Sequence, residues 1–415
     1  MTSQAEHRPL GQLLRRPPRY GINAAAVPLA PGIAAYIRIT DIDESGRFSP
    51  NPKVGVDHPS AANYKLSRGE LVFARTGASV GKSYLYDPRD GELVYAGFLI
   101  NIAPDPNRLN PKYLSLFAQT KEYWDWIVRT SVRSGQPGVN GREYAQLPLP
   151  LPDIATQNAI ASAVTDVDEL IVTLERLIAK KQAIKQGMMQ QLLTGKTRLP
   201  GFSKPWREVR LGDHVTYVKT VALSRAQLDT ASPLRYLHYG DIHTRSAIRV
   251  AAATEAMPRA AKHLVGSAGH LRIGDVVFAD ASEDPDGVGK SVEIASVPNE
   301  GVVAGLHTIA ARFDKTVLAD GFKAYLQFIP SFRESLLRLA AGTKVLATTR
   351  SFISSVTLPL PSVDEQRAIS RALTDCDDEV DILCARLIKA RAIKHGMLQE
   401  LLTGRTRLPV EEVAS

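Results

Sequence analysis

The sequence contains very little cysteine. Two of its 415 residues are cysteines, Cys376 and Cys384. If they share one helix they lie about 12 Å apart along its axis, which is too far for a disulfide bond. Two cysteines are also too few for a cysteine-rich zinc site. The cysteine content therefore excludes a disulfide-stabilised scaffold and a zinc-finger type of fold.

Long apolar runs are also lacking. No stretch of 18 consecutive apolar residues occurs, so we expect no transmembrane helix and no membrane partner. The first residues, MTSQAEHR, do not resemble the charged start and apolar core of a secretory signal peptide. We therefore expect a cytoplasmic protein.

Positive charge is in modest excess. The chain carries 51 Lys and Arg against 43 Asp and Glu, a formal net charge of +8. Residues 1–150 carry 18 basic and 13 acidic side chains, and residues 201–350 carry 19 and 15, so the excess lies in these two regions. This distribution mildly favours a polyanionic partner.

The chain contains an internal repeat. LPLP at 149–152 recurs at 358–361, and LLTGKTRLP at 192–200 recurs as LLTGRTRLP at 401–409, both with an offset of 209 positions. Fainter matches precede these blocks: GELVFA at 69–74 matches GDVVFA at 274–279, and VGKS at 80–83 recurs at 288–291. The sequence therefore predicts two copies of one unit. Each copy has a globular part that differs between the copies, followed by a block whose sequence is similar in both.

The repeat predicts an α+β fold with five segments. The globular parts cover residues 1–148 and 201–357, the blocks cover residues 149–200 and 358–409, and a tail follows at 410–415.

Each block is predicted to form one long helix. Asp153 stands at the N-cap position of the first helix, and SVDE at 362–365 has the form of a capping box for the second. Gly195 and Gly404 are expected to end the helices. Apolar residues recur at alternating steps of four and three, which is typical of a coiled-coil seam. The expected seam residues are Ile160, Val164, Val167, Ile171, Leu174 and Ile178 in the first helix and Ile369, Leu373, Cys376, Val380, Leu383 and Leu387 in the second.

We expect these two helices to pair with each other in an antiparallel coiled coil. Beyond Lys180 and Lys389 the apolar phase shifts, to Ile184, Met188 and Leu192 in the first helix and to Ile393, Met397 and Leu401 in the second.

The globular parts are predicted to mix short strands with helices. Residues 70–74 and 275–279 have the composition of buried strands. Asn110 and Pro111 are expected to start a helix that carries Trp124 and Ile127, and a matching helix is expected over 320–328.

Three motifs that would indicate an enzyme are incomplete or absent in this sequence. GASVGKS at 77–83 lacks the first glycine that a P-loop requires, because Thr76 and, in the second copy, Asp284 stand at that position. Asn110–Tyr113 resembles the NPPY of amino-methyltransferases, but Lys112 replaces the second proline. No lysine follows an acidic residue by two positions, as in the common nuclease core. We expect no catalytic residue and no metal site.

The order of these features resembles the specificity subunits of type I restriction-modification systems. The resemblance rests on the alternation of globular parts with two helical blocks, the ending KQGMMQQLLTGK at 185–196 and the run FARTGASVGK at 73–82. One departure is that the second copy has ASEDPD at 281–286 in place of RTGAS. Another is that Ala155 and Thr156 stand where the second copy has Asp364 and Glu365.

The resemblance implies a non-catalytic DNA-binding subunit of a prokaryotic, cytoplasmic complex. Each globular part would be a target-recognition domain for one half of a bipartite, asymmetric site in double-stranded DNA, and the helix pair would set the unread spacer. The helices would also bind two modification subunits, and restriction subunits would join the complex. This chain would bind no cofactor, since S-adenosylmethionine, ATP and Mg would belong to the partner subunits.

The polar loops of the globular parts are the expected DNA contacts, because Arg and Gln can contact base edges while Lys and Ser more often bind phosphates. They are Arg75, Thr76, Ser79, Lys82, Ser134 and Gln136 in the first copy and Lys290, Ser291, Thr343, Lys344 and Arg350 in the second. Two alternatives stay open: a fused methyltransferase or nuclease, and a two-domain interaction scaffold that does not bind DNA.

Overall fold

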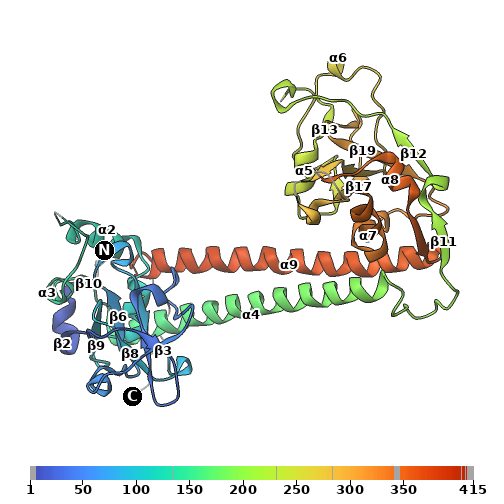
Figure 1. Cartoon of the computed structure of the whole chain (residues 1–415). Helices are drawn as coiled ribbons and strands as arrows, with labels where there is room; N and C mark the ends of the chain where they lie inside the picture. The colour runs from blue at the N-terminus through green and yellow to red at the C-terminus, as the bar shows by residue number, and fades with distance from the viewer. Residues whose placement is uncertain are drawn as a thin grey trace. The chain divides into compact units, whose positions relative to one another are not determined.

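The computed structural model describes residues 6–133, 135–229, 231–282, 284–340, 346–402, 404–406 and 408. The chain divides into two compact units (Figure 1). Unit 1 comprises Met1–Glu175 and Ala385–Ser415, and unit 2 comprises Arg176–Cys384. The division falls inside both long helices, so each unit holds one globular part and half of each helix.

Unit 1 is built on two four-stranded sheets, ordered β2-β9-β6-β7 and β3-β5-β4-β8, and on the pair β1-β10. Its strands are β1 (His7–Pro9), β2 (Leu14–Tyr20), β3 (Val27–Pro28), β4 (Ala34–Ile37), β5 (Val54–Val56), β6 (Leu71–Ala74), β7 (Ser83–Leu85), β8 (Leu93–Tyr95), β9 (Leu99–Pro104) and β10 (Pro148–Pro150). Its short helices are α1 (Pro111–Phe117), α2 (Lys121–Thr130) and α3 (Gly141–Ala145), with 3-10 turns η1 (Leu10–Leu13), η2 (Ile39–Asp41), η3 (Ala61–Tyr64), η4 (Gly77–Ser79) and η5 (Pro88–Asp90).

Unit 2 is built on a five-stranded sheet ordered β12-β19-β15-β17-β14, with the pairs β11-β21, β13-β18 and β16-β20. Its strands are β11 (Arg207–Arg210), β12 (Val215–Val218), β13 (Arg235–Leu237), β14 (Arg249–Ala251), β15 (Val276–Ala279), β16 (Ala281–Ser282), β17 (Ser291–Ser296), β18 (Val302–Ala304), β19 (Thr308–Phe313), β20 (Leu346–Ala347) and β21 (Thr357–Leu360). Its short helices are α5 (Tyr239–Thr244), α6 (Lys262–Val265), α7 (Pro330–Ala340) and α8 (Arg350–Ser355), with 3-10 turns η6 (Leu211–His214), η7 (Arg225–Gln227), η8 (Pro285–Gly287) and η9 (Lys323–Phe328).

The repeated LPLP sequence forms the same strand in both units. It provides β10 and β21, which pair antiparallel with the first strand of their own unit, β1 and β11. Next to each pair, the Leu10 N–H donates to the Leu147 carbonyl and the Leu211 N–H donates to the Val356 carbonyl, both at 2.9 Å. The acceptors are again 209 positions apart. The sequence repeat is therefore also a repeat of backbone hydrogen bonds.

Both predicted long helices are present, as α4 (Ile154–Leu192) and α9 (Val363–Leu402). The predicted N-cap of α4 is confirmed, because Asp153 Oδ1 accepts a hydrogen bond from the Thr156 N–H at 2.7 Å. Past the helix ends, Gly195 and Gly404 adopt positive φ angles of 69° and 70°, which a glycine tolerates without strain.

The capping box predicted for α9 is only half formed. Ser362 Oγ accepts from the Glu365 N–H at 3.4 Å. The Glu365 carboxylate, however, is buried and binds the guanidinium of Arg198 in an ion pair. A buried carboxylate is stabilised more by a cation than by one backbone N–H, so the reciprocal half of the box is lost.

Segments of α4 and α9 run antiparallel inside each unit. In unit 1, Asp168 and Glu175 form ion pairs with Lys394 and Arg391, each at 2.8 Å, so residue numbers rise along one helix as they fall along the other. In unit 2, Lys181 and Lys185 pair in the same way with Glu379 and Asp377. The pairs Asp168–Lys394 and Asp377–Lys185 are equivalent under the offset of 209, so both units use the same contact.

The predicted seam residues lie on the inner sides of the helices. Ile160, Val164, Ile171, Leu174, Ile369 and Leu373 are buried and the other six are partly buried. Ile160 and Val164 also belong to the core of the globular part of unit 1, and Ile369 and Leu373 to that of unit 2.

The predicted shifted phase is wrong at Ile184 and Ile393, whose side chains are 43% and 48% exposed. Its last members, Leu192 and Leu401, are buried, and Met188 and Met397 are partly buried. Near Ile184 and Ile393 the inner positions are taken by Lys185 and Lys394, which form the ion pairs between the helices.

A buried glutamine joins each long helix to its globular part. Gln157 Oε1 accepts from the Asn110 N–H at 2.9 Å, and its Nε2 donates to the carbonyls of Arg108 and Pro152. The equivalent Gln366 makes the same three kinds of contact with residues 317, 319 and 361. Each amide thereby satisfies three backbone groups in the connection between helix and domain.

The predicted strands over 70–74 and 275–279 are confirmed as β6 and β15, but two predicted helices are corrected. The helix that starts at Pro111 stops at Phe117, and Thr120 caps a second helix, α2, which carries Trp124 and Ile127. Within the segment 320–328, Lys323–Phe328 form the 3-10 turn η9 in place of an α-helix. The Glu293 carboxylate holds that turn by accepting the N–H groups of residues 321 and 324, and α7 begins only at Pro330.

Candidate functional site

In unit 1 the predicted loop after β6 lies against the segment before α3. The Gly77 N–H donates to the Pro137 carbonyl at 3.0 Å, and the Val139 N–H donates to the Arg75 carbonyl at 2.9 Å. Thr76 forms a β-bridge with Gly138. These contacts bring Arg75, Thr76 and Gln136 together, and Gln136 is exposed. The structure thus joins two loops that are 60 positions apart in the sequence. Ser134 lies outside the described residues.

Ser79 and Lys82 belong to the same loop, but the ammonium group of Lys82 is already engaged. It forms an ion pair of 2.7 Å with Glu44. Lys82 and Glu44 line a hollow of about 310 Å³ in unit 1, which Arg391 and Lys394 of α9 also line. Lys82 is therefore placed against a cluster of charges, apart from the contacts that unite Arg75 with Gln136.

Unit 2 contains the equivalent arrangement with different side chains. The strand β16, directly after β15, pairs antiparallel with β20: Ala281 lies opposite Ala347, and Ser282 lies opposite Leu346. The Thr348 N–H donates to the Asp280 carbonyl at 2.7 Å. Thr343 and Lys344, two of the expected DNA contacts, lie outside the described residues.

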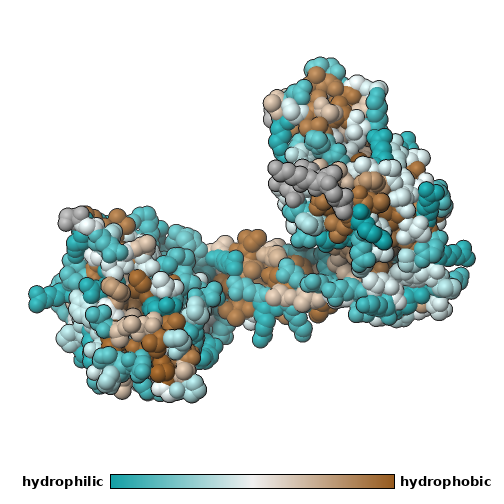
Figure 2. Space-filling view, viewed as in Figure 1, coloured by the Kyte–Doolittle hydropathy of each residue, from teal (hydrophilic) through white to brown (hydrophobic). Residues whose placement is uncertain are grey.

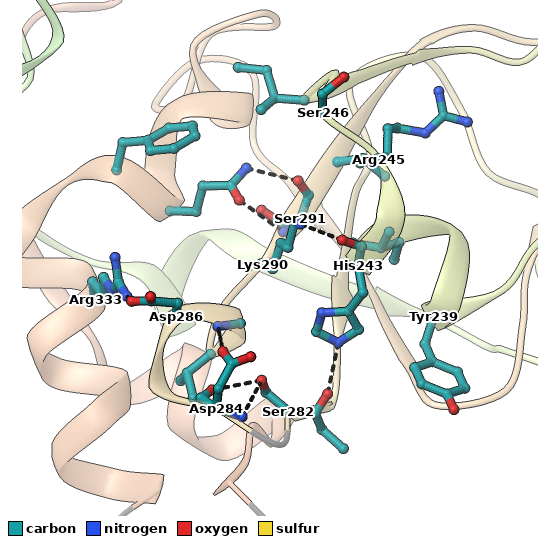
Figure 3. A pocket seen from close by; sticks show the side chains of 18 of the residues that line it. Tyr239, His243, Arg245, Ser246, Ser282, Asp284, Asp286, Lys290, Ser291 and Arg333 are labelled. Carbon is teal, nitrogen blue, oxygen red and sulfur yellow. Dashed lines mark hydrogen bonds and ion pairs between the residues drawn. The ribbon is translucent and has the colours of Figure 1, made fainter. Parts of the chain in front are cut away.

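The loop of unit 2 borders a cavity of about 820 Å³ (Figure 3). Lys290 lines it, and its ammonium group donates to the His243 carbonyl at 2.5 Å. Asp286 and Arg333 form an ion pair of 2.5 Å on the left of the view. Asp284 Oδ1 accepts from the Gly287 N–H at 2.7 Å and so fixes the turn. Charged groups of both signs therefore surround this cavity.

Ser291 does not fit the expected role of a DNA contact. It is only 2% exposed, because it begins β17 inside the five-stranded sheet. Its backbone N–H and carbonyl bind the side chain of Gln327. A buried hydroxyl is not available to a macromolecular ligand, so this expectation is corrected.

Several residues of the cavity were not apparent from the sequence. His243, Asp284, Asp286 and Arg333 come from α5, the loop after β16 and α7. Arg333 lies 47 positions from its partner Asp286. No motif or spacing could signal that contact. The substituted run ASEDPD was the one local indication that the loop differs from its counterpart in unit 1.

Arg350 is exposed at the first position of α8. Its guanidinium lies over the ring of Tyr217, 5.5 Å from the centroid. Burial raises the pKa of the Tyr217 hydroxyl, while a hydrogen bond with Ser354 and the charge of Arg350 act in the opposite direction. This tyrosine, which the sequence did not single out, is thus fixed beside an expected DNA contact.

A buried carboxyl supports the sheet next to the cavity. Glu293 lies in β17 and holds η9 through two backbone N–H groups. Burial raises the pKa of its carboxyl above the usual range, although these N–H groups and nearby Lys323 lower it in part. Its hydrogen bonds are all to the backbone of the fold, so its role is structural.

The long helices also carry exposed apolar side chains. In unit 1, Leu170, Val172 and Ile388 are 51%, 49% and 68% exposed, and in unit 2 Ile382 is 56% exposed. Figure 2 shows brown, hydrophobic side chains along the helical part of the chain. Within the described part of the chain, no helix is long and apolar enough to cross a membrane, and no cluster of three His, Cys, Asp or Glu side chains is placed to hold a metal.

Comparisons with known proteins agree with the sequence resemblance. Residues 34–186 match the family model of the type I restriction modification DNA specificity domain. A putative type I restriction enzyme specificity subunit, MjaX of Methanocaldococcus jannaschii, is 24% identical over 370 residues, which cover 84% of this chain and 80% of that protein.

Two solved structures share the fold. The HsdS subunit of Thermoanaerobacter tengcongensis is 17% identical with a TM-score of 0.51, and 97% of each chain is covered. A type I restriction-modification S subunit from M. genitalium is 13% identical with a TM-score of 0.58, and 95% of each chain is covered. The predicted mixture of helices and sheets and the resemblance drawn from the sequence are confirmed.

Proposed function

Since this chain belongs to the specificity subunits of type I restriction-modification systems, we propose that it recognises a bipartite, asymmetric DNA target. The two globular parts act as target-recognition domains, and each binds one half-site. The chain carries no catalytic residue of its own. It determines where the partner subunits act.

The observation that carries this proposal is one pair of loops that occurs twice with different side chains. In unit 1 the loop pair presents Arg75 and Gln136, and in unit 2 the corresponding loop presents Asp284 and Asp286. Arg and Gln favour guanine and adenine in the major groove, while carboxylates accept hydrogen bonds from cytosine amino groups. A shared backbone with altered side chains therefore suits two different half-sites.

The charge distribution supports a nucleic-acid partner. The globular regions have more basic than acidic side chains, 18 against 13 and 19 against 15. Contacts of such residues with phosphates position a protein on DNA without sequence preference.

The two long helices form the antiparallel coiled coil that sets the spacer between half-sites. The heptad pattern of the seam residues and the antiparallel ion pairs within each unit support this role. At 1.5 Å per residue, the 39 residues of α4 extend about 58 Å. Half-sites one DNA turn apart are separated by about 34 Å, which helices of this length can span.

The exposed apolar side chains of these helices bind two modification subunits, which supply S-adenosylmethionine and the methyl-transfer chemistry. Restriction subunits, which supply ATP hydrolysis and the Mg-dependent nuclease, join the same cytoplasmic complex. Apolar side chains such as Leu170 and Ile388 support this arrangement, because exposed apolar patches commonly mark protein interfaces.

The proposal is tested by measuring the affinity of the purified full chain for labelled duplex DNA at several salt concentrations. We expect the logarithm of the binding constant to fall linearly with the logarithm of salt, with a slope that reflects several phosphate contacts. A chain that binds no duplex, or whose binding does not depend on salt, would be a scaffold without a DNA role.

A further inference from the structure

In each unit an arginine lies over the ring of a tyrosine on an edge strand of the main sheet. Arg75 lies 4.9 Å from the ring centroid of Tyr20 in β2, and Arg350 lies 5.5 Å from that of Tyr217 in β12. The strands β2 and β12 each form one edge of their sheet. Both follow the 3-10 turn that begins with the repeated Leu-Gly, so they are equivalent elements of the repeat.

Each tyrosine hydroxyl is held by a short helix of its own unit, α3 in unit 1 and α8 in unit 2. Tyr20 Oη accepts from the Gly141 N–H at 3.1 Å, at the first residue of α3. Tyr217 Oη donates to the Arg350 carbonyl at 2.8 Å, at the first residue of α8, and also lies 2.8 Å from Ser354 Oγ. Gly141 and Arg350 are 209 positions apart, so the hydroxyls bind corresponding residues of the repeat, although Tyr20 accepts a hydrogen bond and Tyr217 donates one. Each ring is therefore fixed by its strand at one end and by a helix start at the other.

Within the described part of the chain, Arg75 and Arg350 have no carboxylate partner, as is also true of Arg19, which lies 4.9 Å from the ring centroid of Tyr64. Several other arginines do have one. Arg16 pairs with Glu70, Arg133 with Glu143 and Arg333 with Asp286. Among the described residues, the guanidinium groups of Arg75 and Arg350 make a stacking contact and no ion pair. Stacking on an aromatic face fixes the guanidinium plane and leaves its N–H groups free to donate in pairs.

A guanidinium whose plane is fixed by stacking is well placed to bind guanine in particular. Arginine donates two hydrogen bonds to O6 and N7 of guanine in the major groove, the commonest specific contact between proteins and DNA. A phosphate contact would gain less from the fixed plane, because phosphates accept hydrogen bonds from many directions.

We propose that Arg75 and Arg350 each recognise a guanine, one in each half-site, and that Tyr20 and Tyr217 are positioning residues that hold the two guanidinium groups. This inference rests on the proposed function, since it assigns the base contacts within the two target-recognition domains. It also means that each half-site contains a G·C pair whose recognition depends on a tyrosine that touches no base.

The test selects bound sequences from a random duplex library with the purified full chain and with its variants. In Arg75→Gln, we expect the preference at one position of one half-site to change from G to A, because glutamine pairs with adenine. The other half-site should keep its preference. In Arg350→Gln the change should fall in the opposite half-site. Binding to the original site should fall about tenfold or more in each variant.

The positioning role of Tyr20 is tested by the same selection of bound sequences. Tyr20→Leu removes the ring, and we expect discrimination of G from A at that position to fall about tenfold while the salt slope of binding stays unchanged. Tyr20→Phe keeps the ring and should retain most of the discrimination. Arg89→Gln is the matched control, since Arg89 is an exposed arginine of unit 1 that pairs with Asp87 at 2.6 Å. It should leave the selected sequence unchanged.

The outcomes separate the inference from the proposed function. If Arg75→Gln lowers the salt slope by about one but leaves every base preference intact, the arginine contacts a phosphate and the inference is wrong, while DNA recognition stands. If Tyr20→Phe loses discrimination as fully as Tyr20→Leu, the stack does not position the arginine. If the unaltered chain enriches no sequence, the proposed function fails and the inference fails with it.

Discussion

Asp168 is the residue of unit 1 at which the two long helices and the globular part meet. Its carboxylate accepts hydrogen bonds from Lys112 of α1 at 3.0 Å and from Lys394 of α9 at 2.8 Å. Burial by itself would raise the pKa of this carboxyl, but the two ammonium groups hold the pKa below its usual value. The ionised form is therefore the one that stabilises the folded unit.

Replacing Asp168 with asparagine should lower the free energy of unfolding by about 1–2 kcal/mol at pH 7, because two partly buried ammonium groups lose their counter-ion. A carboxyl with a depressed pKa stabilises the fold above its unfolded pKa of about 4, and this contribution is lost as the pH falls through the folded pKa. The difference between wild type and variant should therefore shrink as the pH is lowered below about 4.5.

Urea titrations of the full chain at neutral and acidic pH measure this difference. Asp166→Asn is the matched control, because Asp166 is an exposed carboxylate on the same helix. A difference that stays constant with pH would show that the charge of Asp168 is not what stabilises unit 1.

At the scale of the element, α4 has two sides of opposite character at adjacent positions. Ile171 is a buried seam residue, whereas the next residue, Val172, is 49% exposed. The hydrophobic pattern alone distinguished these positions, since an amphipathic helix places neighbours about 100° apart around its axis.

A carboxylate at Ile171 should destabilise the helix pair. Ile171→Asp places an unpaired charge in the seam and should cost about 2–4 kcal/mol, whereas Val172→Asp should change the stability by less than about 0.5 kcal/mol. Thermal unfolding followed by far-UV circular dichroism compares the two variants. The Ile171 variant should also lose the fixed spacing between half-sites in bound DNA. Equal melting temperatures, or an unchanged spacing, would contradict the proposed spacer.

At the scale of the whole molecule, the two units consist of different numbers of chain segments. The hydrophobic core of the globular part of unit 1 includes Leu398, Leu401 and Leu402, which come from the far end of α9. The main core of unit 2 contains only residues between 192 and 373. Unit 2 is therefore one continuous segment of chain, whereas unit 1 needs two distant segments.

This difference predicts how fragments fold. A fragment of residues 176–384 should unfold cooperatively, because it contains all of its own core. A fragment of residues 1–175 should bind a hydrophobic dye and aggregate, because removing the three leucines exposes apolar surface. Adding a peptide of residues 385–408 should restore a cooperative transition, and the same peptide with Leu401→Asp should not. Cooperative folding of residues 1–175 without the peptide would refute this prediction.

The candidate site could be predicted only in part from the sequence. The loop of Arg75 and Thr76 stood out because it leads into VGKS at 80–83, which recurs at 288–291, and the structure does bring this loop together with Gln136. Ser291 belonged to the same repeat, yet it is buried, because a strand start in the middle of a sheet cannot be distinguished from a loop end by local pattern. The tyrosines that hold Arg75 and Arg350 had no signal in the sequence.

The sequence by itself determined the duplication, the two long helices with the N-cap of α4 and both glycine ends, and the buried strands β6 and β15. These features depend on residues close together in the chain, where periodicity, capping and glycine conformation act. The tertiary structure alone decided which distant groups meet: Glu365 with Arg198 across 167 positions, and Tyr217 with Arg350 across 133. It also decided that each compact unit takes half of both helices. Such contacts depend on packing and burial in three dimensions, and no local pattern records them.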